Sequence, residues 1–268
     1  MPHFETSRGR LYYEENGEGP TVVLIHGLAG DLSAWRPQVA ALSSSYRVIS
    51  FDNRGAGMSE QTADPESTAA MAQDTLELLD GLKVERAQVV GRSMGGAIAQ
   101  HLALMAPDRI QSLVLCASFA RLDPLGRRVL TNMRDVLEWR DSWEDHARHS
   151  VANFVSGDFY NRNPEVVAGI QSLIGGESRL PVCYVTQNHA CLEHDTLESL
   201  HLISCPTLVL SGGRDPICSP TCTQWMVDGL SNVESEVFAD SSHFFLIEEP
   251  ARFMAKLSGW LAEHADEV

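Results

Sequence analysis

A serine flanked by glycines is the feature of this sequence best suited to covalent chemistry. The segment Gly91-Arg92-Ser93-Met94-Gly95 has the G-x-S-x-G pattern of a nucleophile elbow. It follows a short apolar run and opens a helical pattern over residues 93–105, which is the context that an elbow requires. Glycine on either side allows a tight strand-turn-helix to hold the serine backbone in a strained conformation. We therefore expect Ser93 to be a nucleophile at a helix N-terminus, where negative charge is favoured.

A serine hydroxyl at its ordinary pKa is a weak nucleophile and needs a base. His243 lies just beyond the last predicted strand and just before the final helix, at the sheet edge where open α/β sheets bind ligands. Asp215 follows another strand, in a turn over residues 212–216, and is the expected carboxylate that orients the imidazole. The order Ser93, Asp215, His243, each in its own loop after a strand, predicts a catalytic triad. Asp123 is the alternative acid.

Attack on a carbonyl also needs two backbone donors for the oxyanion. The Met94 N–H, directly after the nucleophile, is the first expected donor. The second is the Leu28 N–H, in the loop His26-Gly27-Leu28 after an earlier strand. Gly27 would allow a close backbone approach there, and His26 is expected to orient the loop.

The remaining histidines and cysteines give no metal-site pattern. His146 and His149 have helical spacing but no obvious third ligand, so we expect both to be solvated. The six cysteines are scattered through a mid-sized chain that shows no secretory signal, which favours free thiols. We expect no metal and no organic cofactor.

Two kinds of segment must position these residues. Apolar runs of strand length alternate with helical patterns at residues 21–25, 47–51, 88–90, 111–116, 207–210 and 236–238. Such alternation predicts a mostly parallel sheet with helices on both faces. Residues 119–200 break the pattern with helical segments alone. We expect residues 1–118 and 201–268 to form the core, and residues 119–200 to form a helical cap, or lid, inserted in it.

The cap and its surroundings should choose the substrate. Its aromatic residues could line an apolar pocket; the candidates are Trp139, Trp143 and Phe154, joined by Phe244 next to the expected base, with Phe159 and Tyr160 as further possibilities. The cap is also rich in arginine, and one that faces inward could bind a substrate carboxylate. These are Arg121, Arg127, Arg128, Arg134, Arg140, Arg148, Arg162 and Arg179.

Charge excludes some partners. The 268 residues carry 36 Asp and Glu against 20 Lys and Arg, a formal net charge of −16. Nucleic acids and anionic membranes need clustered positive charge, so neither is an expected partner. No apolar run reaches the ~18 residues of a membrane span, and the N-terminus has no signal-peptide pattern. We expect a cytoplasmic protein with a small-molecule partner; the oligomeric state stays open.

The motifs together resemble those of the α/β-hydrolase superfamily, in the subgroup that carries a helical cap. They are LIHGLAG at 24–30, FDNRGAGMS at 51–59, GRSMGG at 91–96, GGRDP at 212–216 and SSHFF at 241–245. The resemblance implies an eight-stranded sheet and a Ser-His-Asp triad, with Asp52 and Arg54 in a structural loop. The nearest likeness is to 3-oxoadipate enol-lactonases and small carboxylesterases. Related dehalogenases and epoxide hydrolases have an aspartate where this chain has Ser93.

The expected activity is hydrolysis of a small carboxylic ester or lactone through an acyl-enzyme on Ser93. Two alternatives use the same fold. One is another reaction of the same triad, such as C–C bond hydrolysis or perhydrolysis. The other is a non-catalytic protein that binds a small ligand for signalling.

Overall fold

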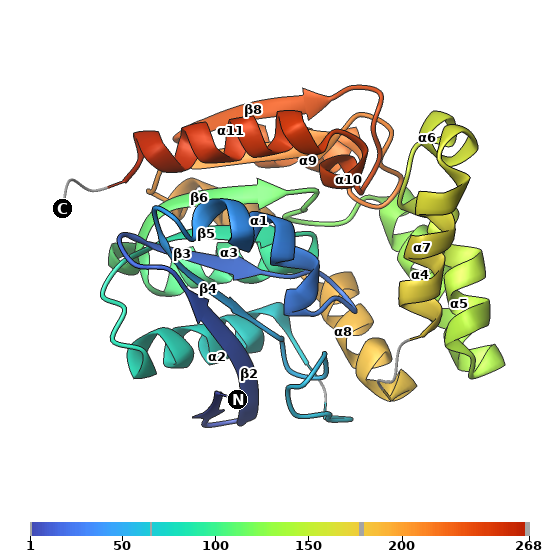
Figure 1. The fold of residues 1–268 in the computed structure, drawn as a ribbon, viewed down its shortest axis with the longest axis horizontal. Coiled ribbons are helices and arrows are strands. Elements are labelled where there is room, and N and C mark those ends of the chain that lie inside the picture. Colours follow the sequence, from blue (N-terminus) through green and yellow to red (C-terminus); the bar gives the residue numbers. More distant parts are fainter. Residues whose placement is uncertain (1, 65, 177–179, 266–268) are drawn as a thin grey trace.

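One sheet of eight strands, in the order β1-β2-β4-β3-β5-β6-β7-β8, runs through the centre of the computed structural model (Figure 1). The structure describes residues 2–64, 66–176 and 180–265. From β4 across to β8 neighbouring strands are parallel, whereas β1 and β2 are antiparallel at one edge. The expected mostly parallel, eight-stranded sheet is confirmed. Its strands are β1 (His3–Thr6), β2 (Gly9–Asn16), β3 (Thr21–Ile25), β4 (Arg47–Phe51), β5 (Ala87–Arg92), β6 (Ile110–Cys116), β7 (Thr207–Gly212) and β8 (Val233–Phe238).

Burial explains which strands could be predicted from the sequence. Every residue of β5, β6 and β7 is buried, because helices cover both faces of a parallel sheet. At the edge, β1 alternates exposed and half-buried residues and has no apolar run. We predicted no strand at β1 for that reason.

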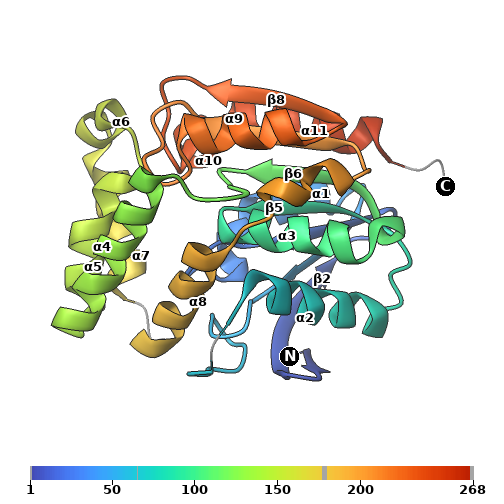
Figure 2. The same ribbon diagram turned by 180° about the vertical axis from the view of Figure 1, so that it is seen from behind.

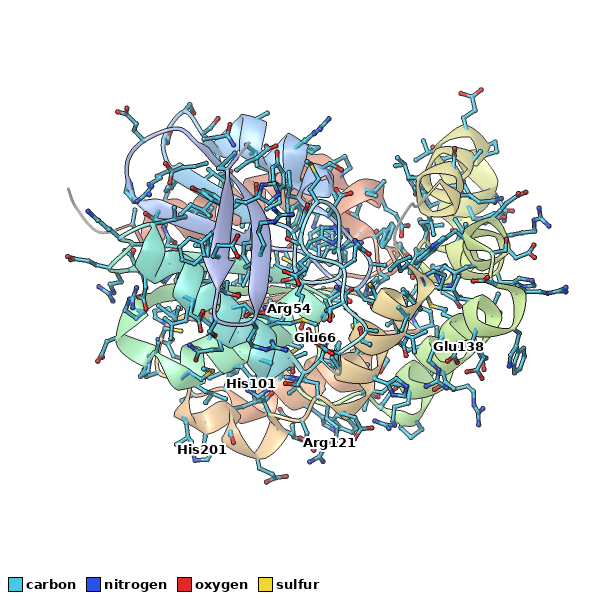
Figure 3. All side chains as sticks on the ribbon, turned by 90° about the horizontal axis from the view of Figure 1, so that it is seen from below. Arg54, Glu66, His101, Arg121, Glu138 and His201 are labelled. Atoms are coloured by element: carbon cyan, nitrogen blue, oxygen red, sulfur yellow. The ribbon has the colours of Figure 1, made fainter. Side chains whose placement is uncertain are left out.

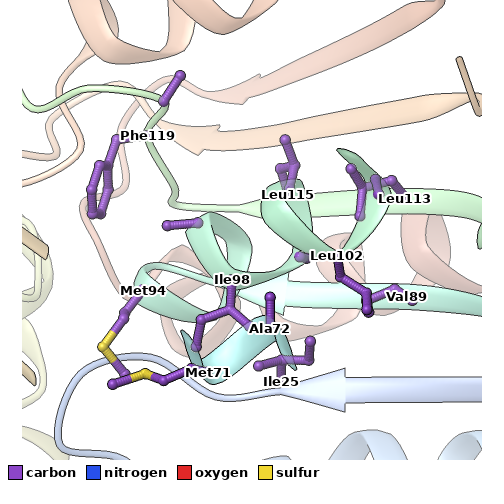
Figure 4. Packing of buried hydrophobic residues seen from close by; sticks show 14 of the residues in the cluster. Ile25, Met71, Ala72, Val89, Met94, Ile98, Leu102, Leu113, Leu115 and Phe119 are labelled. Atoms are coloured by element: carbon purple, nitrogen blue, oxygen red, sulfur yellow. The ribbon is translucent and has the colours of Figure 1, made fainter. Parts of the chain in front are cut away.

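Helices cover both faces of the sheet. On one face lie α1 (Arg36–Leu42) and α11 (Pro250–Glu263), whose apolar side chains form one core cluster (Figure 1). On the other lie α2 (Thr68–Gly81), α3 (Met94–Met105) and α9 (Pro220–Gly229), which form a second cluster (Figure 2). Ile98 and Leu102 of α3 are packed within this second cluster, together with Val89 and Leu113 of the strands (Figure 4). The turn that carries Ser93 therefore leads into a helix that is packed firmly in the core.

Five α-helices are found in the described residues between β6 and β7. They are α4 (Pro124–Arg140), α5 (Trp143–Ser150), α6 (Gly157–Arg162), α7 (Pro164–Gly175) and α8 (Pro181–Glu193), and we refer to them as the cap helices. The first four stand together beyond the carboxyl ends of the parallel strands (Figures 1 and 2). α8 packs residues Ala190 to Leu192 into the core. The segment leaves and rejoins the core at one point, where Arg121 and Asp195 form an isolated β-bridge.

Short 3-10 helices and α10 complete the fold: η1 (Leu32–Trp35), η2 (Pro107–Arg109), η3 (Val151–Asn153), η4 (Leu197–Leu202) and α10 (Phe245–Glu248). No helix of the described residues is long and apolar enough to span a membrane.

The loop after β4 is tied down by its charged residues. Asp52 accepts the Leu32 N–H at 2.7 Å and the Met58 N–H at 2.8 Å. Arg54 is buried and pairs with Asp74 at 2.9 Å and with Glu66 at 3.4 Å (Figure 3). These contacts fasten the loop to η1 and α2, and burial raises the pKa of Glu66 in spite of the arginines.

Candidate active site

Ser93 sits in the sharp turn between β5 and α3. Its backbone has φ 54° and ψ −120°, a conformation that a non-glycine residue rarely adopts and that clusters at functional sites. The Ser93 N–H donates to the Cys116 carbonyl of β6 at 2.8 Å, and its own carbonyl accepts from the Ser118 hydroxyl at 2.9 Å. A Cβ on Gly91 would lie 2.4 Å from the Gly95 oxygen, so the turn needs glycine there. The surroundings thus enforce the strained turn.

His243 and Asp215 are joined directly. His243 Nδ1 lies 2.7 Å from Asp215 Oδ2, and both side chains are buried. The other oxygen of Asp215 accepts the N–H groups of Ile217 at 2.7 Å and Cys218 at 2.9 Å. A carboxylate that accepts from Nδ1–H leaves Nε2 with its lone pair, which is the tautomer of a general base.

The alternative acid, Asp123, is engaged elsewhere. It caps the N-terminus of α4 by accepting the Gly126 N–H at 2.8 Å, and it accepts the Ser219 hydroxyl at 2.6 Å. In the described part of the chain, no hydrogen bond or ion pair joins it to the His243 ring.

Ser93 and His243 line the same cavity, of about 310 Å³. Among the described residues no hydrogen bond joins the Ser93 hydroxyl to the imidazole, whose bond is to Asp215. Catalytic hydrogen bonds of this kind are often long before a substrate binds.

The N–H groups of Leu28 and Met94, the two expected oxyanion donors, make no hydrogen bond with any described residue. The loop with Leu28 approaches closely, since a Cβ on Gly27 would lie 2.9 Å from the Ser93 Cβ. His26 stacks edge-on against Trp35 and covers Gly30, where no side chain would fit. Of the two expected oxyanion donors, Leu28 lines the cavity together with Ser93, and Met94 follows Ser93 directly in the chain.

Three of the four aromatic residues expected in the pocket line the cavity: Trp143, Phe154 and Phe244. Phe154 stacks on Phe244 with their centroids 4.6 Å apart. The expectation for Trp139 is wrong. Its side chain is 80% exposed and lines a separate hollow on the cap, because Leu130, Met133 and Leu137 form the buried face of α4.

His146 also differs from expectation. It is buried and lines the cavity, with Nδ1 3.0 Å from the Met133 carbonyl and its ring 4.8 Å from that of Tyr184. His149, one turn later, is exposed as expected and borders the same hollow as Trp139. A spacing of three residues therefore did not place both rings on one side of the helix.

Sequence reasoning missed several cavity residues. Arg92 directly precedes Ser93 and Ile217 lies two residues after Asp215, whereas Tyr184 comes from α8 and carried no signal. Cys218 is a further neighbour. Its ligand atom and those of Asp215 and His243 lie within 4.8 Å of one another, the one trio of this kind among the described residues. Burial raises the pKa of Cys218 well above its usual value, so the thiol is protonated and a poor metal ligand.

Fold and site together define a hydrolase built on an α/β sheet. The chain belongs to the α/β-hydrolase fold family, whose model matches residues 20–250. RutD of Caulobacter sp. (strain K31), for which a carbamate hydrolase activity is proposed, is 33% identical over 264 residues, covering 95% of this chain and 97% of RutD. The 3-oxoadipate enol-lactonase 1 of Acinetobacter baylyi is 30% identical, over 90% of this chain and 88% of that protein.

A solved structure supports the similarity to enol-lactonases. The enol-lactonase from Burkholderia xenovorans LB400 superposes with a TM-score of 0.88 and 30% identity, covering 97% of this chain and 100% of that one. The expected resemblance to enol-lactonases within this family is confirmed, and the protein is a hydrolase.

Proposed function

We propose that this protein hydrolyses a small carboxylic ester or lactone through an acyl-enzyme on Ser93. The observation that carries the proposal is the buried 2.7 Å contact between His243 Nδ1 and Asp215, beside a strained serine in the same cavity. A neutral imidazole held in this tautomer can take the proton of the serine hydroxyl.

In the first half-reaction the Ser93 oxygen attacks the carbonyl carbon while His243 Nε2 takes the hydroxyl proton. The oxyanion forms between the Leu28 and Met94 N–H groups, which have no other described partner. As the intermediate collapses, the bond to the alkoxy oxygen breaks, and His243 returns its proton to the leaving alcohol. In a lactone that alcohol stays attached to the acyl group.

In the second half-reaction a water replaces the alcohol. His243 takes a proton from it, the hydroxide adds to the ester of Ser93, and the acid leaves as the serine recovers its proton. Asp215 stabilises the imidazolium in both halves and remains ionised. Every step is a proton transfer or an acyl transfer, so the atoms and charges balance with these residues alone.

We further propose that the cap helices select the acyl group. Trp143, Phe154 and Ile170 of this segment line the cavity opposite the loops of the core. The cavity volume, about 310 Å³, suits a small molecule.

A carbamate is the second candidate substrate. It is favoured by the likeness to RutD, for which that activity is proposed. Its carbonyl lies between nitrogen and oxygen, and the same serine could attack it.

The test compares wild type with Ser93→Ala on 4-nitrophenyl esters, simple lactones and an aryl carbamate, with product analysis. We expect Ser93→Ala to lower kcat by about 10⁴-fold or more and to leave the unfolding temperature unchanged. Ser172→Ala, an exposed serine of α7, is the matched control and should keep the wild-type rate. A fluorophosphonate should modify wild type at Ser93, as located by peptide mass spectrometry.

Equal rates in wild type and Ser93→Ala would overturn the proposal. Turnover of none of these substrates by wild type would also contradict it, and would favour C–C bond hydrolysis or ligand binding without catalysis. Peracid formation from an acid and hydrogen peroxide would identify a perhydrolase.

A further inference from the structure

Two arginines of the described residues are buried, and they are held in opposite ways. Arg54 is 3% exposed and pairs with two carboxylates, those of Asp74 and Glu66. Arg92 is 6% exposed and makes no ion pair with any described residue. A buried cation is costly unless an anion compensates it, so the two cannot have the same role.

Arg92 contacts an aromatic ring in place of a carboxylate. Its guanidinium carbon lies 4.1 Å from the centroid of Phe244, and its Nε has no hydrogen-bond partner. A cation over an aromatic face gains only part of what an ion pair would. Burial lowers the pKa of Arg92 to about 10, so the group is still charged at neutral pH. The Asp215 carboxylate is near enough to favour this charge, but no described carboxylate forms an ion pair with Arg92.

Arg92 lines the same cavity as the candidate nucleophile and the candidate base. Arg92 directly precedes Ser93, Phe244 directly follows His243, and all four residues line the same cavity. The acidic residue that lines this cavity, among those the structure describes, is Asp31. Its side chain accepts the Ser33 N–H at 2.8 Å and so caps η1.

No described arginine of the cap helices lines this cavity, although the cap was where we expected an inward-facing one. Several pair with acidic neighbours: Arg121 at the base of the cap with Asp195 (Figure 3), Arg127 with Glu193, Arg134 with Asp135, and Arg148 with Glu144. Arg128, Arg140 and Arg162 are exposed. Arg179 lies outside the described residues.

We propose that Arg92 binds the carboxylate of an anionic substrate, so that the protein prefers esters or lactones that carry a free carboxyl group near the reacting carbonyl. The planar guanidinium can donate two parallel hydrogen bonds to a carboxylate, and both gain strength in a water-poor cavity. A surface with a net charge of −16 would otherwise disfavour such a substrate. That the anion is an ester or lactone rests on the proposed function, whereas the anion site itself does not.

The test uses matched substrates, the monomethyl and dimethyl esters of glutaric and adipic acid. Within each pair the molecules differ by one methyl group, which removes the charge. Methanol release is measured for wild type, Arg92→Met, Arg92→Lys and the control Arg140→Met, an exposed arginine of α4. We expect wild type and Arg140→Met to prefer the monomethyl ester by about tenfold or more in kcat/KM, mainly through KM.

In Arg92→Met that preference should disappear, while the dimethyl ester reacts within about threefold of the wild-type rate, since Met fills the space without charge. Arg92→Lys should keep part of the preference, because lysine retains the charge but loses the planar fork. An unchanged preference in Arg92→Met would overturn the proposal. So would an equal loss on both esters, which would make Arg92 a residue that only positions the triad.

A binding measurement separates this proposal from the proposed function. Calorimetry on Ser93→Ala should detect the monomethyl ester, and adding Arg92→Met in that background should weaken binding about tenfold or more. If wild type turns over neither ester and this difference persists, the anion site stands and the proposed function fails. If Ser93→Ala binds both esters equally well, the anion site is refuted.

Discussion

The backbone around the site and the outer helices α6 and α7 of the cap differ in how closely they approach their surroundings. Around the site, a Cβ on Gly95 would lie 2.2 Å from the Ile25 carbonyl oxygen, and one on Gly212 would lie 2.2 Å from that of Ser242. In the cap, Gly157 and Gly169 have nothing within 4 Å of that position. Large apolar side chains such as Leu173 remain exposed there as well. The backbone around Ser93 therefore tolerates little change, whereas the outer surfaces of α6 and α7 leave room for it.

The largest expected effect tests whether the chemistry belongs to the core. Asp215→Asn should lower kcat by about 10⁴-fold, because an amide no longer stabilises the imidazolium or fixes its tautomer. Asp123→Asn is the matched control at the root of the cap; asparagine also caps helices well, so its rate should stay within about twofold. Steady-state kinetics on one ester measures kcat for both variants. A larger loss in Asp123→Asn than in Asp215→Asn would reverse the assignment of the acid.

The second prediction tests the close approach of backbones at the elbow. Gly91→Ala should lower the free energy of unfolding by about 2–3 kcal/mol, since the new methyl group meets the Gly95 carbonyl and Gly96. Denaturant titration measures the change. A loss below about 0.5 kcal/mol would mean that the turn relaxes easily and that the contrast with the cap is overstated.

The third prediction compares two tryptophans of the cap. Trp143 lines the cavity and stacks edge-on with Tyr184, whereas Trp139 is on the outer face. Trp143→Ala should change kcat/KM by about tenfold and shift the preference toward longer acyl groups, because it enlarges the pocket. Trp139→Ala should leave the acyl-length profile unchanged. Equal profiles for both variants would remove the cap from substrate selection.

The smallest expected effect concerns Gly169, on the exposed side of α7. Gly169→Ala should stabilise the protein by about 0.5–1 kcal/mol, because alanine restricts the unfolded chain and nothing obstructs its methyl group. Thermal unfolding should show a slightly higher midpoint, with activity unchanged. A destabilised variant would show that the cap is packed more tightly than its structure indicates.

The sequence predicted the core far better than the cap, for physical reasons. β3 and β4 occupy the ranges predicted for them, because a strand buried on both faces is mostly apolar. The positions of Ser93, Asp215 and His243 follow from where β5, β7 and β8 end. In the cap, burial depends on how each helix is turned, and aromatic content alone misled us about Trp139.

Helical spacing could have corrected that expectation. Leu130, Met133 and Leu137 mark the buried face of α4, and Trp139 lies about 200° around the helix from Leu137. Nothing comparable could have indicated Tyr184, because contact between α8 and the cavity is made only in three dimensions. Arg92 was visible in the motif, but its lack of a carboxylate partner was not.

Hydrogen bonds join the loop that carries Asp215 to the loop that carries His243. The Arg214 N–H donates to the Ser241 carbonyl at 3.0 Å, and the Ser242 hydroxyl donates back to the Arg214 carbonyl at 3.2 Å. Because these bonds join the two loops, a displacement of one loop displaces the other. The Asp215 carboxylate and the His243 imidazole therefore move together. Ser93 is held by a different strand, because its N–H donates to the Cys116 carbonyl of β6. Within the proposed triad, the contact between the Ser93 hydroxyl and the imidazole is the one not made by a hydrogen bond among the described residues, so in the proposed mechanism the bound substrate brings these two groups together.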